Sequence, residues 1–356
     1  MESRGSWRVL RPFEHLLGRE AIGNLLARDK PMQGPSSQSK TGSVAQRRDD
    51  AARVAWLYFV AGRTQEEIAA LLDLSRQAVQ RLVALAVSEK LIKFRLDHPI
   101  ASCEELARGL SERYELEFCD VTPSDPAAPV SISGIAAATA IRLQRLLASK
   151  VPTVICVGTG RTLRAAVEEL DMLDRPQHKV VSLVGSMAAG GHASPYDVVM
   201  RLGDKVGAQR YPMPAPVVTA TIEDREVLQN QRAFAALRGL REQARASFVG
   251  ISEIGWQSPI HRDGFITDAD VSALLEAGAI GEITGWSFDA AGQLLDNPLN
   301  DRVASLPLEI PPRRLTVVSG GGPQKVAPLR AALKGRLLSA LVTDEATAKA
   351  LIDAGI

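Results

Sequence analysis

The segment 158–162 (GTGRT) combines residue types that bind small polar or anionic ligands. It follows the β-branched run 151–157 and precedes a helical pattern, which would place it at a helix N-terminus. There the glycines let a ligand approach the backbone, while free N–H groups and the helix dipole favour an anion. It is not a dinucleotide fingerprint, because Leu163 stands where G-x-G-x-x-G requires glycine. A tight strand-to-helix turn without a ligand is the alternative interpretation.

A second glycine-rich segment, 320–325 (GGGPQK), again follows an apolar run and precedes a helical pattern. It does not satisfy the P-loop pattern G-x-x-x-x-G-K. It would nevertheless place Lys325 near a strand end, where α/β folds bind ligands. A surface lysine at the start of a helix is the alternative.

Further candidates come from polar residues in small-residue segments. Ser186 lies in the loop 185–191, Asp197 follows that loop, and Glu253 and Asp289 lie in segments of mixed small and apolar residues. A carboxylate accepts hydrogen bonds from sugar hydroxyls, but Asp289 in Asp-Ala-Ala-Gly is equally suited to a turn. The ligand-binding candidates are Gly158, Thr159, Gly160, Arg161, Thr162, Ser186, Asp197, Glu253, Asp289, Gly321 and Lys325.

The elements that must position these residues alternate between helix and strand from Cys103 onward. Apolar, β-branched runs predict buried strands at 151–157, 180–184, 247–251 and 315–318. Helical periodicity predicts helices at 104–113, 133–149, 163–170, 196–206 and 226–244. This alternation is typical of a Rossmann-like α/β domain with a mainly parallel sheet.

Residues 50–96 show a different pattern, of three short helices followed by an extended segment. Gly62 ends the first helix, and Thr64 with Glu67 forms a capping box for the second. Ser75 caps the third helix after a two-residue turn. The alternation in 91–96 predicts a strand, so the pattern is that of a winged helix-turn-helix.

The third helix leaves a cluster of arginine and glutamine side chains facing outward near its N-terminal end, which recognition helices present to the major groove. Arginine pairs with guanine there and glutamine with adenine, while the strand 91–96 offers cations to phosphates. A plain three-helix packing module is the alternative. The DNA-binding candidates are Thr64, Ser75, Arg76, Gln77, Gln80, Arg81, Lys93 and Arg95.

Composition and charge divide the 356 residues into three parts. Residues 1–48 carry a net charge of +5, and the stretch 31–46 is rich in Pro, Gly, Ser and Gln, so we expect a basic, flexible extension. Residues 49–98 would form the DNA-binding domain and 99–356 the ligand-binding and oligomerisation domain. The segment 49–100 carries no net charge. A DNA-binding module without net positive charge is unusual, because phosphate contacts supply most of the affinity.

Several protein classes are disfavoured by the sequence. Its three cysteines and five histidines show no metal-binding spacing, and we expect no metal and no cofactor. It has no apolar run long enough to span a membrane and no signal-type start, so we expect a cytoplasmic protein.

Several motifs together make the chain similar to the SorC family of bacterial transcriptional regulators. The segment 56–86 (WLYFVAGRTQEEIAALLDLSRQAVQRLVALA) looks like the helix-turn-helix of that family. GTGRTL (158–163), SLVGSMAAGG (182–191), YPMPAPVV (211–218), FVGISEIG (248–255), GAIGEITGWSFDAAGQ (278–293) and VTDEATAKALIDAGI (342–356) follow in the family's order. The resemblance covers residues 49–356 and is nearest to regulators of polyol and sugar-alcohol catabolism.

The resemblance implies an effector domain similar to the fold of glucosamine-phosphate deaminase, ribose-phosphate isomerase and CoA-transferase. It also implies operator DNA as a partner, a sugar, sugar phosphate or polyol as the effector, and assembly into a homodimer or homotetramer. Lys325 resembles the family's ligand-contacting lysine. The stretch after 191 departs from the family's asparagine-containing pattern, and Asp197 there suits a neutral polyol better than an anion.

A sugar-phosphate isomerase or deaminase on the same fold is the alternative function. Such an enzyme needs a base beside a substrate carbon, and no segment assembles the available acids into an enzyme motif. A helix-turn-helix would also have no purpose in it. We therefore expect a regulator, not an enzyme.

Overall fold

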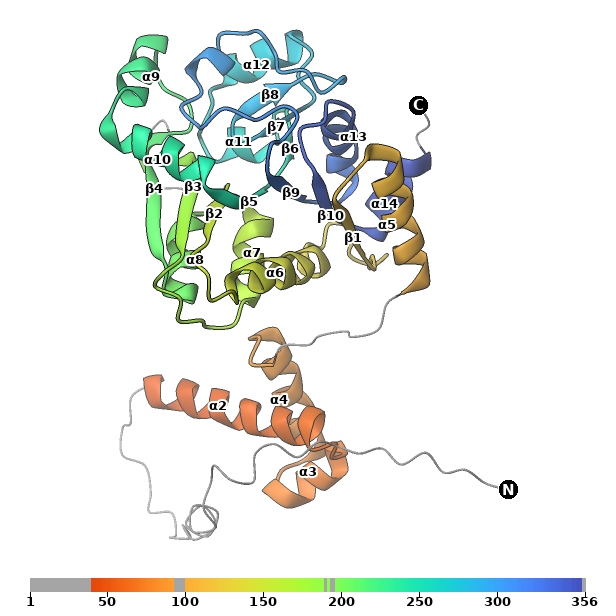
Figure 1. Cartoon of the computed structure of the whole chain (residues 1–356). Coiled ribbons are helices and arrows are strands. Elements are labelled where there is room, and N and C mark those ends of the chain that lie inside the picture. Colours follow the sequence, from red (N-terminus) through yellow and green to blue (C-terminus); the bar gives the residue numbers. More distant parts are fainter. Residues whose placement is uncertain (1–39, 93–99, 189–190, 193–195, 354–356) are drawn as a thin grey trace. The chain divides into compact units, whose positions relative to one another are not determined.

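The computed structural model describes residues 40–92, 100–188, 191–192 and 196–353. Contacts within the chain define two compact units, residues 1–94 and 95–356. Figure 1 traces both. Among the described residues, no helix is long and apolar enough to cross a membrane.

The N-terminal unit is built from helices α2 (Lys40–Ala55), α3 (Gln65–Leu72) and α4 (Arg76–Ser88), with a π-helical turn η1 (Trp56–Val60) continuing α2. Val54, Ile68 and Val79 bring one buried side chain from each helix into a common core. The first helix begins at Lys40, ten residues before the start near Asp50 that the sequence pattern predicts. Residues 40–48 are helical, which corrects the expectation that the flexible extension runs to residue 48. The predicted wing with Lys93 and Arg95 lies outside the described residues.

Both predicted helix caps are present. The Glu67 backbone N–H donates to the Thr64 hydroxyl at 3.2 Å, and the Glu67 carboxylate accepts from the Thr64 N–H at 2.8 Å. This reciprocal bonding lowers the pKa of Glu67. Ser75 accepts the Ala78 N–H at 3.1 Å. The two caps fix where α3 and α4 begin, and so set the turn between them.

Removal of the first cap should loosen the helix-turn-helix. Thr64→Ala leaves the Glu67 N–H without its side-chain acceptor and should cost about 1 kcal/mol of local stability. Hydrogen exchange of the α3 amides measures this, with Thr64→Ser as a control that keeps the hydroxyl. Equal protection in the Ala and Ser variants would contradict the assignment of the cap.

The C-terminal unit is centred on a seven-stranded sheet in the order β1-β10-β9-β5-β2-β3-β4, in which every neighbouring pair is parallel. This confirms the predicted α/β class. The strands are β1 (Phe118–Thr122), β2 (Val154–Val157), β3 (Lys179–Met187), β4 (Gln209–Pro216), β5 (Ala244–Val249), β9 (Leu315–Ser319) and β10 (Ala340–Asp344).

Helices cover both faces of this sheet, because its strands alternate apolar side chains between two separate cores. Ile155 and Val157 of β2 face one core and Cys156 faces the other. The first core packs α6 (Ser133–Leu147), α7 (Arg161–Glu169) and α8 (Val199–Val206). The second packs α5 (Ala101–Tyr114), α10 (Arg232–Glu242), α13 (Val326–Lys334) and α14 (Glu345–Asp353).

The single helix predicted at 226–244 is two helices, which corrects the periodicity argument. Thr221 caps α9 (Ile222–Gln229) by accepting the Asp224 N–H, and the extended backbone of Gln231 separates α9 from α10. The two helices have apolar patterns of similar period, so the sequence alone does not separate them.

A small additional layer lies beyond the sheet and has its own core around Val271, Phe265 and Trp286. It consists of the antiparallel strands β6 (Ser252–Glu253), β7 (Gly281–Ile283) and β8 (Trp286–Phe288) with helices α11 (Pro259–Arg262) and α12 (Asp268–Glu276). None of these elements was predicted. They supply one wall of the cavity described below.

Candidate functional site

The sheet changes its direction of growth between β2 and β5. From β2 the chain moves outward to β3 and β4, whereas from β5 it moves the opposite way to β9 and β10. The loops after β2 and β5 therefore diverge, and α/β proteins bind ligands in the crevice that such divergence opens. A cavity of about 560 Å³ lies at this place.

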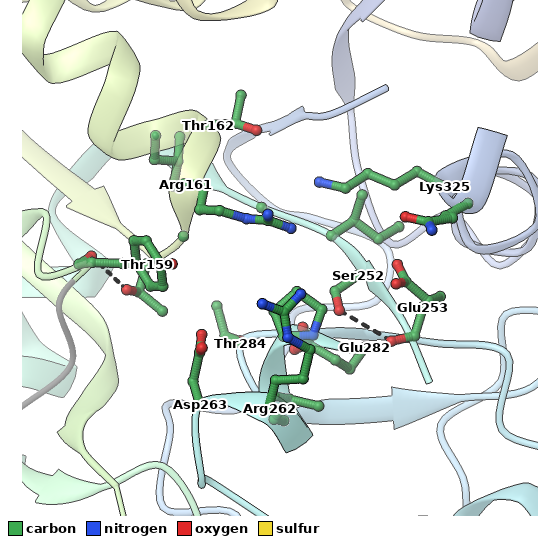
Figure 2. A pocket seen from close by; sticks show the side chains of 18 of the residues that line it. Thr159, Arg161, Thr162, Ser252, Glu253, Arg262, Asp263, Glu282, Thr284 and Lys325 are labelled. Carbon is green, nitrogen blue, oxygen red and sulfur yellow. Dashed lines mark hydrogen bonds between the residues drawn. The ribbon is translucent and has the colours of Figure 1, made fainter. Parts of the chain in front are cut away.

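The cavity brings together most of the predicted ligand-binding residues. Its wall includes the loop after β2, the loop after β5 and the loop after β9, which are far apart in sequence. Figure 2 shows Arg161 and Lys325 extending into it from opposite sides. The predicted residues that line it are Thr159, Gly160, Arg161, Thr162, Glu253, Gly321 and Lys325.

Four predicted residues are not among those that line the cavity: Gly158, Ser186, Asp197 and Asp289. The buried Gly158 donates its N–H to the Phe248 carbonyl. Asp197 accepts the Met200 N–H at the start of α8. Asp289 accepts the N–H groups of Ala291 and Gln293, each at 2.9 Å. Its carboxylate therefore serves the turn, which was the alternative interpretation.

Charged groups of both signs meet around Lys325. The ammonium is attracted by Glu253 and Glu282 and repelled by Arg161, but its burial is the largest effect and lowers its pKa. Burial likewise raises the pKa of Glu282, against the opposing influence of the Gly285 N–H and of Lys325. Removing a charge from water is costly unless the charge is paired, and the opposite charges of Glu253 and Glu282 offset part of that cost for Lys325.

The loop that carries Lys325 is held by the buried carboxylate of Asp344. This side chain accepts the Gly322 N–H at 3.1 Å and the hydroxyls of Ser124 and Thr347. A side chain at Gly321 would collide with it, because a Cβ there would lie 2.0 Å from the Asp344 Oδ2. Gly321 is thus required by close packing, and the loop has little freedom to move.

The opposite wall is a two-residue hairpin turn between β7 and β8. Its residues Thr284 and Gly285 have φ values of 52° and 91°, a left-handed conformation that a β-branched residue adopts at a cost. The turn returns the Gly285 N–H to the Glu282 carboxylate at 2.8 Å. It thereby fixes this carboxylate in the cavity wall, and stored strain of this kind is common at functional sites.

Helix α11 contributes to the cavity wall and is tied to α12 through His261. The imidazole bonds the Trp256 carbonyl at 2.9 Å and the Asp268 carboxylate at 2.7 Å. Both ring nitrogens face acceptors, and the carbonyl and then the carboxylate raise the pKa of His261. Only the protonated ring donates to both partners.

This tie should make the stability of the C-terminal unit depend on pH. Because the folded-state pKa of His261 is raised, its contribution is fully present below about pH 6.5 and is lost as pH rises through the raised pKa. Thermal unfolding from about pH 5.5 to about pH 8.5 should therefore show a fall in the wild type that His261→Gln lacks. A parallel fall in both proteins would contradict this role.

Sequence analysis missed several polar residues of the cavity. Glu282 and Thr284 lie on the hairpin, and Arg262 and Asp263 lie at α11. The signal for the first two was an isolated glutamate and a Thr-Gly pair within an otherwise apolar segment, 278–288. The two at α11 had no local signal.

The predicted DNA-reading side chains form an exposed surface on the N-terminal unit. Arg76, Gln77, Gln80 and Arg81 are all exposed on the first two turns of α4. Arg76 forms an ion pair with Glu66 of α3 at 3.0 Å, which partly neutralises it. Thr64 and Ser75 act as caps, so their hydroxyls are occupied by the helices.

Among the residues that the structure describes, no group of three or more His, Cys, Asp or Glu side chains could hold a metal ion. The described part of the chain thus presents an α/β unit with a cavity and a helix-turn-helix unit.

Comparisons with known proteins agree with this arrangement. Residues 98–353 match the family model described as "Putative sugar-binding domain". The erythritol catabolism regulatory protein EryD of Brucella abortus is 35% identical over 302 residues, covering 85% of this chain and 96% of that protein. The transcriptional regulator LsrR of Escherichia coli K12 is 27% identical over 313 residues, covering 85% and 94%.

The fold is also shared with solved structures. The full-length sorbitol operon regulator SorC from Klebsiella pneumoniae superposes with a TM-score of 0.64 at 20% identity, covering 86% of this chain and all of that one. The chain belongs to the SorC family of sugar-binding transcriptional regulators.

Proposed function

We propose that this protein regulates transcription of a carbohydrate catabolic operon by binding operator DNA through α4 and a small polyhydroxy effector in the cavity between β2 and β5. One observation carries the proposal. The domain that matches the family model contains a cavity with charged side chains where the chain diverges between β2 and β5, and it shares a chain with the capped helix α4, whose first two turns expose arginine and glutamine side chains. Such a protein would act in the cytoplasm, where its DNA is.

A polyol is the class of effector that the relatives favour. The EryD relative is named for erythritol catabolism and the SorC structure for the sorbitol operon. The cavity suits such a ligand because its carboxylates accept hydrogen bonds from hydroxyls, while Lys325 and backbone N–H groups donate them. We propose Thr159, Gly160, Arg161, Thr162, Glu253, Glu282, Gly321 and Lys325 as its contacts.

The switch would operate by linkage between effector and DNA. An effector that binds one arrangement of paired subunits more tightly shifts the population toward it, and so changes the spacing of two recognition helices. We propose a homodimer or homotetramer as the DNA-binding form, and the cavity as a binding site without catalytic activity.

The recognition helix can be tested on the promoter DNA beside the protein's own gene. Arg76→Ala and Arg81→Ala should each weaken binding about tenfold or more in a gel-shift titration, because each removes one base or phosphate contact. Arg48→Ala is the matched control: Arg48 is an exposed arginine of α2 that is ion-paired to Glu89. Unchanged affinity in both α4 variants, or an equal loss in the control, would refute the assignment.

The cavity can be tested by thermal shift with a panel of polyols, sugars and sugar phosphates. A ligand at about 100 times its Kd stabilises the folded state by about 2.7 kcal/mol, and Lys325→Ala should abolish the shift caused by the best compound. Lys334→Ala removes an exposed lysine from the end of α13 and should leave the shift intact. A full shift in the Lys325 variant would exclude this lysine from the site.

A further inference from the structure

The described wall of the cavity carries equal numbers of positive and negative side chains. Arg161, Arg262 and Lys325 supply the cations. Glu253, Asp263 and Glu282 supply the carboxylates. A site for a phosphorylated ligand requires an excess of cationic or N–H donors, since a phosphate monoester carries about −1.5 to −2 charges near neutral pH.

The solvent exposure of these charged side chains also argues against a phosphate site. Arg161 and Arg262 are exposed, so solvent screens them, whereas Lys325, Glu253 and Glu282 are half-buried. Asp263 is half-buried as well, so the half-buried part of the described wall holds three carboxyl groups and one ammonium. Lys325, Glu253 and Glu282 act on one another electrostatically, and burial favours the neutral form of Glu282. Even with Glu282 protonated, Lys325 is matched by Glu253, so no net positive charge remains there for an anion.

The loop 158–162 is the alternative place for a phosphate, because it begins α7. Its first threonine is already committed, since the Thr159 hydroxyl donates to the Tyr196 carbonyl at 2.6 Å, as Figure 2 shows. A phosphate at this loop would have Arg161 as its cation. The positive charge of the neighbouring Lys325 is already compensated by Glu253 and Glu282. Lys325 therefore adds little to the attraction that Arg161 exerts on a phosphate.

Uncharged hydroxyl groups fit this wall better. Each hydroxyl both donates and accepts, so a vicinal pair can donate to Glu253 or Glu282 and accept from Lys325. The carboxylate of Glu282 is already oriented by the Gly285 N–H, and the loop of Lys325 by Asp344. Donors and acceptors of opposite sign are thus held in place on separate elements of the cavity wall.

We propose that the effector is an unphosphorylated polyhydroxy compound, and that the carboxylate of Glu253 beside Lys325 excludes its phosphate esters from the cavity. This inference rests on the proposed function of the cavity as the effector site.

The test is a calorimetric titration of the full-length protein with erythritol and ribitol, each beside its monophosphate, and with inorganic phosphate. At least one free polyol should bind, and its phosphate ester should bind at least about tenfold more weakly. A phosphate ester that binds more tightly than its parent polyol would overturn the inference while leaving the proposed function intact. No binding of any compound would overturn both.

A charge-changing variant provides the second arm. Glu253→Gln removes one carboxylate at nearly constant shape, so polyol binding should weaken while binding of the phosphate ester rises about tenfold. Asp197→Asn is the matched control, because it removes a carboxylate of the same unit that is not among the described cavity-lining residues. No gain for the ester in Glu253→Gln, or an equal gain in Asp197→Asn, would show that Glu253 does not set this preference.

Discussion

The divergence of the chain at β2 and β5 is the constraint on which the C-terminal unit depends. These two strands are hydrogen-bonded neighbours, yet the chain leaves their carboxyl ends in opposite directions. No helix can cover that point from both sides, so a crevice with exposed backbone groups results from the topology. The loops after β2, β5 and β9 and the small β6–β8 layer have only to supply side chains around it. The order of the strands therefore sets the position of the crevice.

Polar groups in such a crevice are useful only if they are held in place. Asp344 fixes the loop of Lys325 from behind, and the strained Thr284–Gly285 turn fixes Glu282. Both devices are unfavourable in isolation, one being a buried carboxylate and the other a β-branched residue at positive φ. A protein selected for stability alone would replace them with apolar residues and a better turn former. Their presence is consistent with the proposed binding role of this wall.

Sequence analysis identified the features that local patterns specify. The loop 158–162 and Lys325 could be found because a strand, a glycine-rich turn and a helix follow one another along the chain. The hairpin residue Glu282 could not, since its place in the cavity depends on how the β6–β8 layer packs on the sheet. Asp289 was misleading for a related reason: a carboxylate that bonds its own turn has the same sequence signature as one that bonds a ligand. Strand β1 pairs with β10 at the far end of the chain, so its pairing has no local signal.

The weak charge of the DNA-binding unit has a consequence for how the two units work together. Residues 49–100, which include α3 and α4, carry no net charge, although α2 adds Lys40, Arg47 and Arg48 before this segment, and Arg76 is partly neutralised by Glu66. One copy therefore gains little from phosphate contacts, which supply most non-specific affinity. Two copies bound to adjacent half-sites gain through effective concentration instead, and that gain vanishes when their spacing is wrong. If a single DNA-binding unit binds DNA weakly, the DNA affinity of the regulator depends strongly on how its effector domains pair. On this argument, the low charge of α3 and α4 would make DNA binding depend on the pairing of subunits, and so on the proposed effector.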